Sequence, residues 1–367
     1  MSIYIGLMLW SILIGCIFFT NKDNNLKKKI YILLVYIPLI IVSGLRDISV
    51  GTDTTFFHDW YTFCSNFDDT FGWYIEVREN VKLEFVFVYT AYFLNLFLFD
   101  AQVMIFIMST ITLSGVAYAF YKYSKSIWLS TFLFIAFFSY QETMNIVKQG
   151  FAAMLMFNGY GYLKNNFKWK YLRTIIIAMC FHASAIVHVI FLLLMPIKLK
   201  KILFITIFLG IIIYFGGNFI LSYLMGFSLK YTELYIGTVY TTPRGFGPGL
   251  IQILGIIILM SITYYLNKCN RFSEIEKKDI NIYNVFMFLY IVVIVLQYMI
   301  PIVVRFTIYV AWYMYLLVPL LVSKLNEKQS LFFKYMLYIT IIIIGFLYCI
   351  YCMNIGIHEV VPYKFCF

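Results

Sequence analysis

Residues 27–54 read KKKIYILLVYIPLIIVSGLRDISVGTDT, and this stretch decides the fold class. A cluster of lysines precedes an apolar run over residues 30–43, and a segment with Arg46, Asp47 and Asp53 follows it directly. Lysines at one end of an apolar run mark the cytoplasmic side of a membrane helix. The stretch therefore predicts a helix that crosses a membrane and delivers charged side chains to the opposite face.

Composition extends this interpretation to the whole chain. The 367 residues are 63% hydrophobic and 21% aromatic, and only 12% are charged. A soluble protein carries about a quarter charged residues, so this apolar surplus predicts a polytopic membrane protein. The net charge of +11 lies mostly in short lysine clusters between apolar runs, where it sets topology and does not indicate nucleic-acid binding.

Apolar runs recur along the entire sequence without a fixed period. They fall near residues 3–20, 30–43, 83–99, 102–121, 127–143, 146–163, 172–196, 202–225, 249–266, 282–300, 302–322 and 331–353. We expect an all-α fold of about 10–12 hydrophobic helices, including re-entrant or interfacial segments, in a single transmembrane domain over residues 1–367. The longest polar connections, 44–82 and 226–248, are expected to be outer loops. The first run has no basic flank before it, so it reads as a membrane helix and not as a signal peptide.

The positions of the lysine clusters constrain which runs cross. Lys29 and Lys122 both belong to clusters expected on the cytoplasmic side, yet three apolar runs separate them. One of the three should not cross, and the run at 83–99 is the best candidate because it is short. Glu84, Ala91 and Asn95 fall on one helical face there, as in a helix that lies in the membrane interface.

The run at 172–196 poses the same problem, because basic clusters stand on both sides of it. One interpretation is a re-entrant or broken segment around His182, which is tolerated at membrane depth only where the backbone lines a cavity. The other is that Lys198, Lys200 and Lys201 snorkel on the outer side. The sequence favours neither.

The cysteines do not form a disulfide framework. There are seven of them, and an odd number without regular spacing argues against structural disulfides. Cys349 and Cys352 form a CxxC, but within an apolar run, where two cysteines are more often small core residues than a redox or metal pair.

The first candidate for chemistry is the segment Gly44–Thr54. An Arg at the outer end of a helix can hold a phosphate with its two-pronged guanidinium, and an Asp beside it can accept a proton from a sugar hydroxyl. Arg46, Asp47 and Asp53 are therefore candidate site residues. The alternative is structural: Arg46 snorkels and pairs with Asp47, while Gly51 and Asp53 make a turn.

The second candidate is the segment Glu142–Ala152. Glu142, Asn145, Gln149 and Ala152 share one helical face, and Lys148 lies beside it. A polar strip between two apolar runs, at the expected outer end, suits binding of sugar and phosphate by Asn145, Lys148 and Gln149. The alternative is the hydrophilic turn of a helical hairpin.

Three further residues stand in unusual surroundings. Charge within hydrocarbon costs roughly 2.5 to 3.5 kcal/mol on insertion scales, so Arg305 in an apolar run has either an acidic partner on another helix or a ligand. His182 lies among small residues, where a core histidine is more common than a catalyst, and no zinc-type ligand spacing surrounds it. Arg244, on a loop rich in Gly and Pro, either closes over a substrate or is solvated.

Together these segments resemble the EpsG family, the Wzy-type polymerases of bacterial exopolysaccharides, over almost the whole chain. The family shows short motifs in a fixed order, and each has a counterpart here. The counterparts are Gly44–Arg46, Gly51–Thr54, Asn145–Ala152, Phe181–Ala185, Arg305–Tyr309 and Pro362–Phe365. One departure stands out: the family's mid-chain Arg is Lys148 here, which keeps the charge but loses the two-pronged geometry.

The resemblance implies a helical bundle similar to the GT-C glycosyltransferases, in the bacterial inner membrane, with an active site facing the periplasm or cell exterior. The implied substrate is an oligosaccharide repeat unit on a polyprenyl diphosphate, and the implied reaction is glycosyl transfer to another lipid-linked unit. The resemblance implies flippase and chain-length regulator proteins as further partners. It implies no cofactor, and it leaves open whether a divalent metal is needed. On this view the substrate-binding residues are Arg46, Asn145, Lys148, Gln149, Arg244 and Arg305, and the acceptor proton goes to Asp53, Asp47 or His182.

Two other classes of membrane protein fit the same composition. A flippase or transporter for the lipid-linked sugar would also need cations in membrane helices, but more often shows internal repeats, and none is visible here. A membrane O-acyltransferase for sugars should carry a His and an Arg in or beside its first helices, and the first run contains neither.

Overall fold

Helices account for nearly all of the regular structure in the computed structural model. It describes residues 1–18, 24–64, 84–97, 100–194, 247–299, 301–326 and 330–367, and within these ranges it contains no strands. The chain forms two compact units, residues 1–186 with 318–367 and residues 187–317, and each is described by itself. The prediction of an all-α membrane protein is confirmed.

Five helical segments in the described part are long and apolar enough to cross a membrane. They are α6 (Ala101–Tyr123), α15 (Gly247–Lys268), α16 (Glu274–Met299), the stretch Val303–Leu325 and α19 (Leu331–Asn354). Shorter apolar helices include α1 (Ser2–Phe18), α5 (Phe85–Asn95) and α7 (Ile127–Ala136). The expected run at 202–225 lies outside the described residues, as do residues 65–82 of the expected outer loop 44–82 and residues 226–246 of the expected outer loop 226–248. The single-domain expectation stays a prediction.

Helix α2 (Asn25–Gly44) packs antiparallel to α6. Asn24 caps the start of α2 by accepting from the backbone N–H of Lys27 at 2.7 Å. At the other end the Gln102 side chain donates to the Gly44 carbonyl at 2.6 Å, so the end of α2 meets the start of α6. A Cβ at Gly44 would come within 2.5 Å of the Phe106 ring, which explains a glycine at this crossing.

The runs at 127–143 and 146–163 form a hairpin that is broken in both arms. Helix α7 is followed by α8 (Ser139–Asn145), α9 (Val147–Asn158) and α10 (Tyr160–Lys164). Phe138, with a φ of 68°, separates α7 from α8, and Ile146, with a ψ of 59°, separates α8 from α9. The hydrogen bond from Tyr123 to the Asn158 carbonyl, 3.2 Å, brings the end of α9 to the end of α6. The junction of α8 and α9, which is the tip of the hairpin, therefore lies near the end of α2.

The helix lengths bear on two of the questions left by the lysine clusters. Helix α5 has 11 residues, a length of about 16 Å, which is well short of the hydrocarbon thickness, in agreement with a run that does not cross. Helix α11 (Lys168–Phe181) ends at His182, and the chain continues in short turns η1 (Ala183–Val187) and α12 (His188–Leu194). The helix is therefore broken at His182, while Lys198, Lys200 and Lys201, on which the alternative depends, lie outside the described residues.

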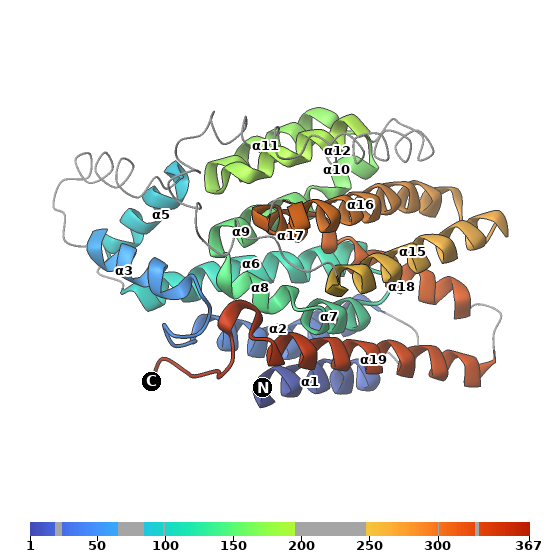
Figure 1. The fold of residues 1–367 in the computed structure, drawn as a ribbon, viewed down its shortest axis with the longest axis horizontal. Helices are drawn as coiled ribbons and strands as arrows, with labels where there is room; N and C mark the ends of the chain where they lie inside the picture. Colours follow the sequence, from blue (N-terminus) through green and yellow to red (C-terminus); the bar gives the residue numbers. More distant parts are fainter. Residues whose placement is uncertain (19–23, 65–83, 98–99, 195–246, 300, 327–329) are drawn as a thin grey trace. The chain divides into compact units, whose positions relative to one another are not determined.

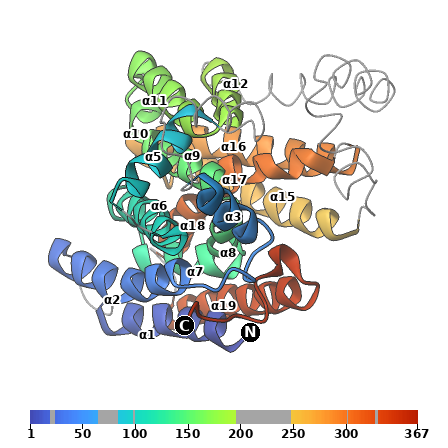
Figure 2. The same cartoon turned by 90° about the vertical axis from the view of Figure 1, so that its left-hand side faces the viewer.

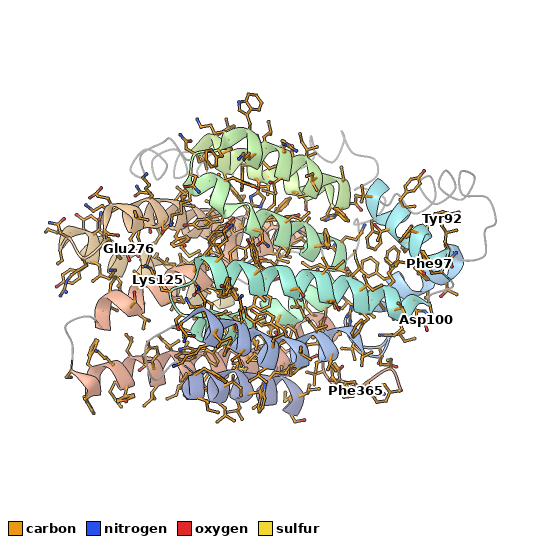
Figure 3. All side chains as sticks on the ribbon, turned by 180° about the vertical axis from the view of Figure 1, so that it is seen from behind. Tyr92, Phe97, Asp100, Lys125, Glu276 and Phe365 are labelled. Carbon is orange, nitrogen blue, oxygen red and sulfur yellow. The ribbon has the colours of Figure 1, made fainter. Side chains whose placement is uncertain are left out.

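The first unit has two chemically different ends. We call the basic end the one where α2 and α11 begin and α6 and α10 end; its lysines are Lys27, Lys28, Lys29, Lys122, Lys125, Lys164, Lys168 and Lys170. We call the polar end the opposite one, where α2 ends, α6 begins and α8 meets α9. Figure 3 shows Asp100 and Lys125 at opposite ends of α6. Both chain termini lie toward the polar end (Figures 1 and 2), and the Tyr4 hydroxyl donates to the Val360 carbonyl at 3.1 Å.

The second unit contains a 3-10 turn that the sequence analysis did not predict. Pro301 opens a 3-10 turn, η2 (Pro301–Phe306), between α16 and α17 (Thr307–Ala311). Proline lacks the N–H that continues an α-helix, so the run at 302–322 does not begin as one regular helix. Arg305 lies in this turn and is half-buried. His188, in the same unit, is fully buried among the rings of Phe191 and Tyr309.

The CxxC in α19 belongs to the core, as predicted. Cys349 and Cys352 are 0% and 1% exposed, and both are free thiols. Cys349 lies opposite Gln141 of α8, where the Gln141 amide nitrogen approaches its sulfur at 4.0 Å.

Candidate functional site

Arg46 follows the last turn of α2 and is fully buried. Its guanidinium donates to the Thr54 hydroxyl at 3.2 Å, to the Ser109 hydroxyl at 3.4 Å and to the Met144 carbonyl at 2.6 Å. A further short bond reaches the Ser43 carbonyl. In the part of the chain that the structure describes, no carboxylate accepts from Arg46. The alternative in which it pairs with Asp47 is therefore wrong for this arrangement, because the Asp47 carboxylate accepts from Ser49 instead.

Asn145 ends α8 and joins three parts of the polar end. Its side-chain oxygen accepts from the Asp53 backbone N–H at 2.8 Å and from the Thr52 hydroxyl at 2.7 Å. Its side-chain nitrogen lies 3.1 Å from Nδ1 of His358. Asn145 is only 5% exposed. In this arrangement the oxygen of its amide is hydrogen-bonded to the loop Gly44–Thr54 and not to a ligand.

A second group of polar side chains carries both signs of charge. The Lys148 ammonium lies 2.6 Å from one oxygen of Glu84, and Nδ1 of His182 lies 2.6 Å from the other. The side chains are 15%, 18% and 21% exposed for Lys148, Glu84 and His182. We call these three residues the ionic cluster, and we call Arg46, Asn145 and His358 with their partners the anchor cluster.

The neighbours of Glu84 decide its ionisation. Burial would raise the pKa of its carboxyl, but the hydrogen bond from His182 and the charge of Lys148 outweigh burial and hold the pKa at about 2. Glu84 is therefore a carboxylate at every physiological pH. A carboxylate on Nδ1 of an imidazole fixes the tautomer and the orientation of the ring.

Breaks in the helices explain why the ionic cluster forms where it does. Glu84 precedes the first residue of α5, Lys148 stands in the first turn of α9, and His182 is the residue on which α11 stops. The Lys148 ammonium also lies 5.7 Å from the centroid of the Phe87 ring, which stacks on Trp60 of α3 (Thr54–Cys64) at 5.2 Å. The cluster therefore combines an ammonium paired with a carboxylate, an imidazole and two neighbouring aromatic rings.

Most of the predicted site residues lie at this end of the first unit. Asp47 and Asp53 are partly exposed on the loop, and Gln149 is buried beside Lys148 in α9. Arg305 belongs to the second unit, and Arg244 lies outside the described residues. No group of three or more His, Cys, Asp or Glu side chains suited to a metal ion is found among the residues described.

Sequence reasoning missed two residues of the polar end, Glu84 and His358. Glu84 was assigned to the polar face of an interfacial helix, and the structure instead places it just before that helix, against Lys148 and His182. An acid at the start of an apolar run was the available signal, but nothing in the sequence names its partners. His358 stands in a polar C-terminal segment without any pattern that connects it to residue 145.

Comparisons with known proteins agree with the short motifs. The family model of the EpsG family matches residues 29–365, nearly the whole chain. Neither the curated proteins nor the solved structures contain a match. The matched range includes Arg46, Glu84, Asn145, Lys148, His182 and His358. The chain therefore belongs to the EpsG family.

Proposed function

We propose that this protein polymerises oligosaccharide repeat units that are carried on a polyprenyl diphosphate. Membership of the EpsG family implies a polysaccharide polymerase-like role in a membrane. The proposed reaction is a glycosyl transfer. The bond between the anomeric carbon and the diphosphate oxygen breaks, a bond from that carbon to an acceptor hydroxyl forms, and the polyprenyl diphosphate leaves with the negative charge.

The observation that supports this reaction is the geometry of the ionic cluster. His182 has Nδ1 on the Glu84 carboxylate at 2.6 Å, and no hydrogen bond to its other ring nitrogen occurs among the described residues. This arrangement suits Nε2 of His182 to take the acceptor proton as a general base. Among the three acid–base candidates from the sequence, we therefore favour His182 over Asp47 and Asp53.

Lys148 supplies the charge that the leaving group needs. A cation fixed beside the place where charge develops is usually the largest contribution to catalysis of this kind. The pair with Glu84 holds the Lys148 ammonium next to His182, so the base and the cation act on the two ends of one displacement. In the same proposal Asp53 and Gln149 contact sugar hydroxyls, and Arg244 and Arg305 bind substrate groups from outside this cluster.

The proposed orientation follows from the lysines. Positive clusters mark the cytoplasmic side, so the polar end faces the periplasm or cell exterior. Impermeant maleimide applied to intact cells should label a cysteine placed at the exposed Ser49, and should not label one placed at Lys125. The reverse pattern would put the ionic cluster on the cytoplasmic side.

The central experiment removes the proposed base. His182→Ala should lower the turnover of purified lipid-linked repeat units by roughly 10²- to 10⁴-fold, the usual contribution of general base catalysis. His58→Ala is the matched control, because His58 lies on α3 and pairs with Asp59 at 3.3 Å. Wild-type turnover in His182→Ala, at equal protein level, would contradict the assignment of the base.

Polymer profiles from cells separate the classes of protein. Loss of long polymer with retained single repeat units in a deletion strain supports a polymerase. Accumulation of lipid-linked units on the inner face supports a flippase, and loss of acetyl groups alone supports an acyltransferase. Either of the last two results would overturn the proposed function.

A further inference from the structure

The C-terminal segment after α19 folds back onto the loop Gly44–Thr54. The backbone N–H of Asp47 donates to the Lys364 carbonyl at 3.0 Å, and Cys366 returns a bond to the Leu45 carbonyl at 3.0 Å. Closer to α19, Gly51 donates to the Glu359 carbonyl at 3.1 Å. The segment is therefore bonded to the loop near both of its own ends.

His358 is the side chain through which this segment reaches Asn145. The Asn145 oxygen already accepts from Thr52 and Asp53, which fixes the orientation of the amide and turns its NH₂ group toward His358. Nδ1 of His358 must then be the acceptor, with the proton on Nε2 in the neutral ring. One chain of bonds therefore runs from His358 through Asn145 to the backbone of Asp53.

The backbone around His358 adopts an unfavourable conformation that its surroundings must maintain. His358 has a φ of 62° and Glu359 a φ of 50°, in the left-handed region that residues other than glycine rarely adopt. The His358 ring also stacks on Phe138, with centroids 6.2 Å apart and an angle of 15°. A strained backbone that persists is a mark of functional positions, because the surrounding contacts must maintain it.

We infer that His358 is a positioning residue for the proposed polymerase site. Through Asn145 it holds Thr52 and Asp53, and with them the loop Gly44–Thr54, against the junction of α8 and α9. Lys148 stands in the first turn of α9, three residues after Asn145, so this junction also carries one member of the ionic cluster. The role of this link in turnover rests on the proposed function, whereas its role in docking the loop does not.

The test uses three variants of the full-length protein. His358→Ala removes the acceptor, while His358→Asn places an acceptor oxygen close to the position of Nδ1 and tolerates the left-handed backbone. Glu359→Ala is the matched control, because it puts an alanine at a φ of 50° in the same turn but keeps the carbonyl that bonds Gly51. Each variant is purified as the monodisperse fraction and compared with the parent protein.

Loop docking is measured without reference to activity. Val50 is 0% exposed in the docked loop, and its side chain makes no polar contact, so Val50→Cys is a suitable reporter. We expect slow maleimide labelling of position 50, quantified by mass spectrometry, in the parent, in His358→Asn and in Glu359→Ala. His358→Ala should label several times faster.

Turnover is measured on the same proteins without the reporter. His358→Ala should lower kcat by roughly 10- to 100-fold, because a small misplacement of a catalytic group has effects of this size, while KM for the lipid-linked substrate changes less. His358→Asn and Glu359→Ala should stay near the parent. Equal losses in His358→Ala and Glu359→Ala would assign the effect to the backbone and overturn the inference, as would unchanged labelling in His358→Ala.

The two proposals fail in different ways. If His182→Ala stops turnover and His358→Ala changes neither labelling nor turnover, only the positioning role is lost. If His358→Ala speeds labelling but the parent protein shows no glycosyl transfer, the loop link stands and the proposed function fails.

Discussion

The anchor cluster and the ionic cluster lie at the same end of the first unit but satisfy their charges in opposite ways. Arg46 is 0% exposed and donates only to hydroxyl and carbonyl groups among the described residues. Lys148 is 15% exposed, and its ammonium lies 2.6 Å from a carboxylate that also contacts His182. The first arrangement is fully buried, whereas the side chains of the second are partly exposed and include a carboxylate and an imidazole.

The choice of cation fits this difference. The Arg guanidinium carries five donors in a rigid plane and is weakly hydrated, so it can be buried while it joins several elements. The Lys ammonium is a compact charge that pairs easily and reorients easily. The comparison indicates that Arg46 maintains the loop, and it supports the proposal that Lys148 is the cation for the substrate diphosphate. The predictions below separate these two roles.

The largest effect is expected at the anchor cluster. Arg46→Lys keeps the charge but cannot reach the acceptors on α2, α6 and α8 at once, and each lost hydrogen bond to a charged group costs roughly 1.5–3 kcal/mol. With two or more bonds lost, we expect a fall of at least about 3 kcal/mol in the free energy of unfolding. The measurement is the thermal midpoint of the detergent-solubilised protein. Arg173→Lys, at an exposed position of the basic end, is the control.

A diphosphate ligand role for Arg46 predicts a different outcome. In that case Arg46→Lys would retain its thermal midpoint and its cellular level, and only KM or turnover would change. Such a result would show that the buried guanidinium is released to the substrate during the reaction.

The next largest effect concerns the pH dependence of stability. The pKa of Glu84 is about 2 in the folded protein, below the ordinary 4.5, so its stabilising contribution is complete above pH 4.5 and is lost as the pH falls toward 2. The difference corresponds to about 3 kcal/mol. Thermal midpoints of wild type and Glu84→Gln should therefore differ most at neutral pH and converge in acid. Parallel curves over this range would show that Glu84 is not held by Lys148 and His182.

The sequence predicted the position of the site better than its contacts. Arg46, Lys148 and His182 could be selected because charge and histidine are costly in apolar runs, and all three lie at the polar end of the first unit. A break at His182 was one of two interpretations that the flanking basic clusters left open. The partners Glu84 and His358 were not, because the choice of partner is decided by tertiary contacts across 64 and 213 residues of sequence. The 3-10 turn after Pro301 was not predicted either, because its residues continue the apolar run.

An intermediate effect is expected from Lys148. Lys148→Arg should be tolerated, while Lys148→Met should lower turnover by about 10- to 150-fold, the equivalent of 1.5–3 kcal/mol for one charged hydrogen bond. Turnover of purified substrate is compared at matched protein level, with Lys125→Met at the basic end as the control. Full activity in Lys148→Met would show that Lys148 does not bind the diphosphate, and Arg46 and Arg305 would become the candidates.

The smallest effect is expected at Asp47, and it decides between the candidate bases. The Asp47 carboxylate accepts from the Ser49 hydroxyl at 2.6 Å and from the Ser49 N–H at 3.0 Å, and these bonds lower its pKa and make it a weaker base. Asn at this position keeps an acceptor oxygen for Ser49. Asp47→Asn should therefore leave the thermal midpoint, the turnover and its pH profile close to those of the wild type. If Asp47→Asn stops turnover while His182→Ala does not, the acceptor proton goes to the Asp47 carboxylate and not to the His182 imidazole. The Glu84–His182 pair would then be a structural contact.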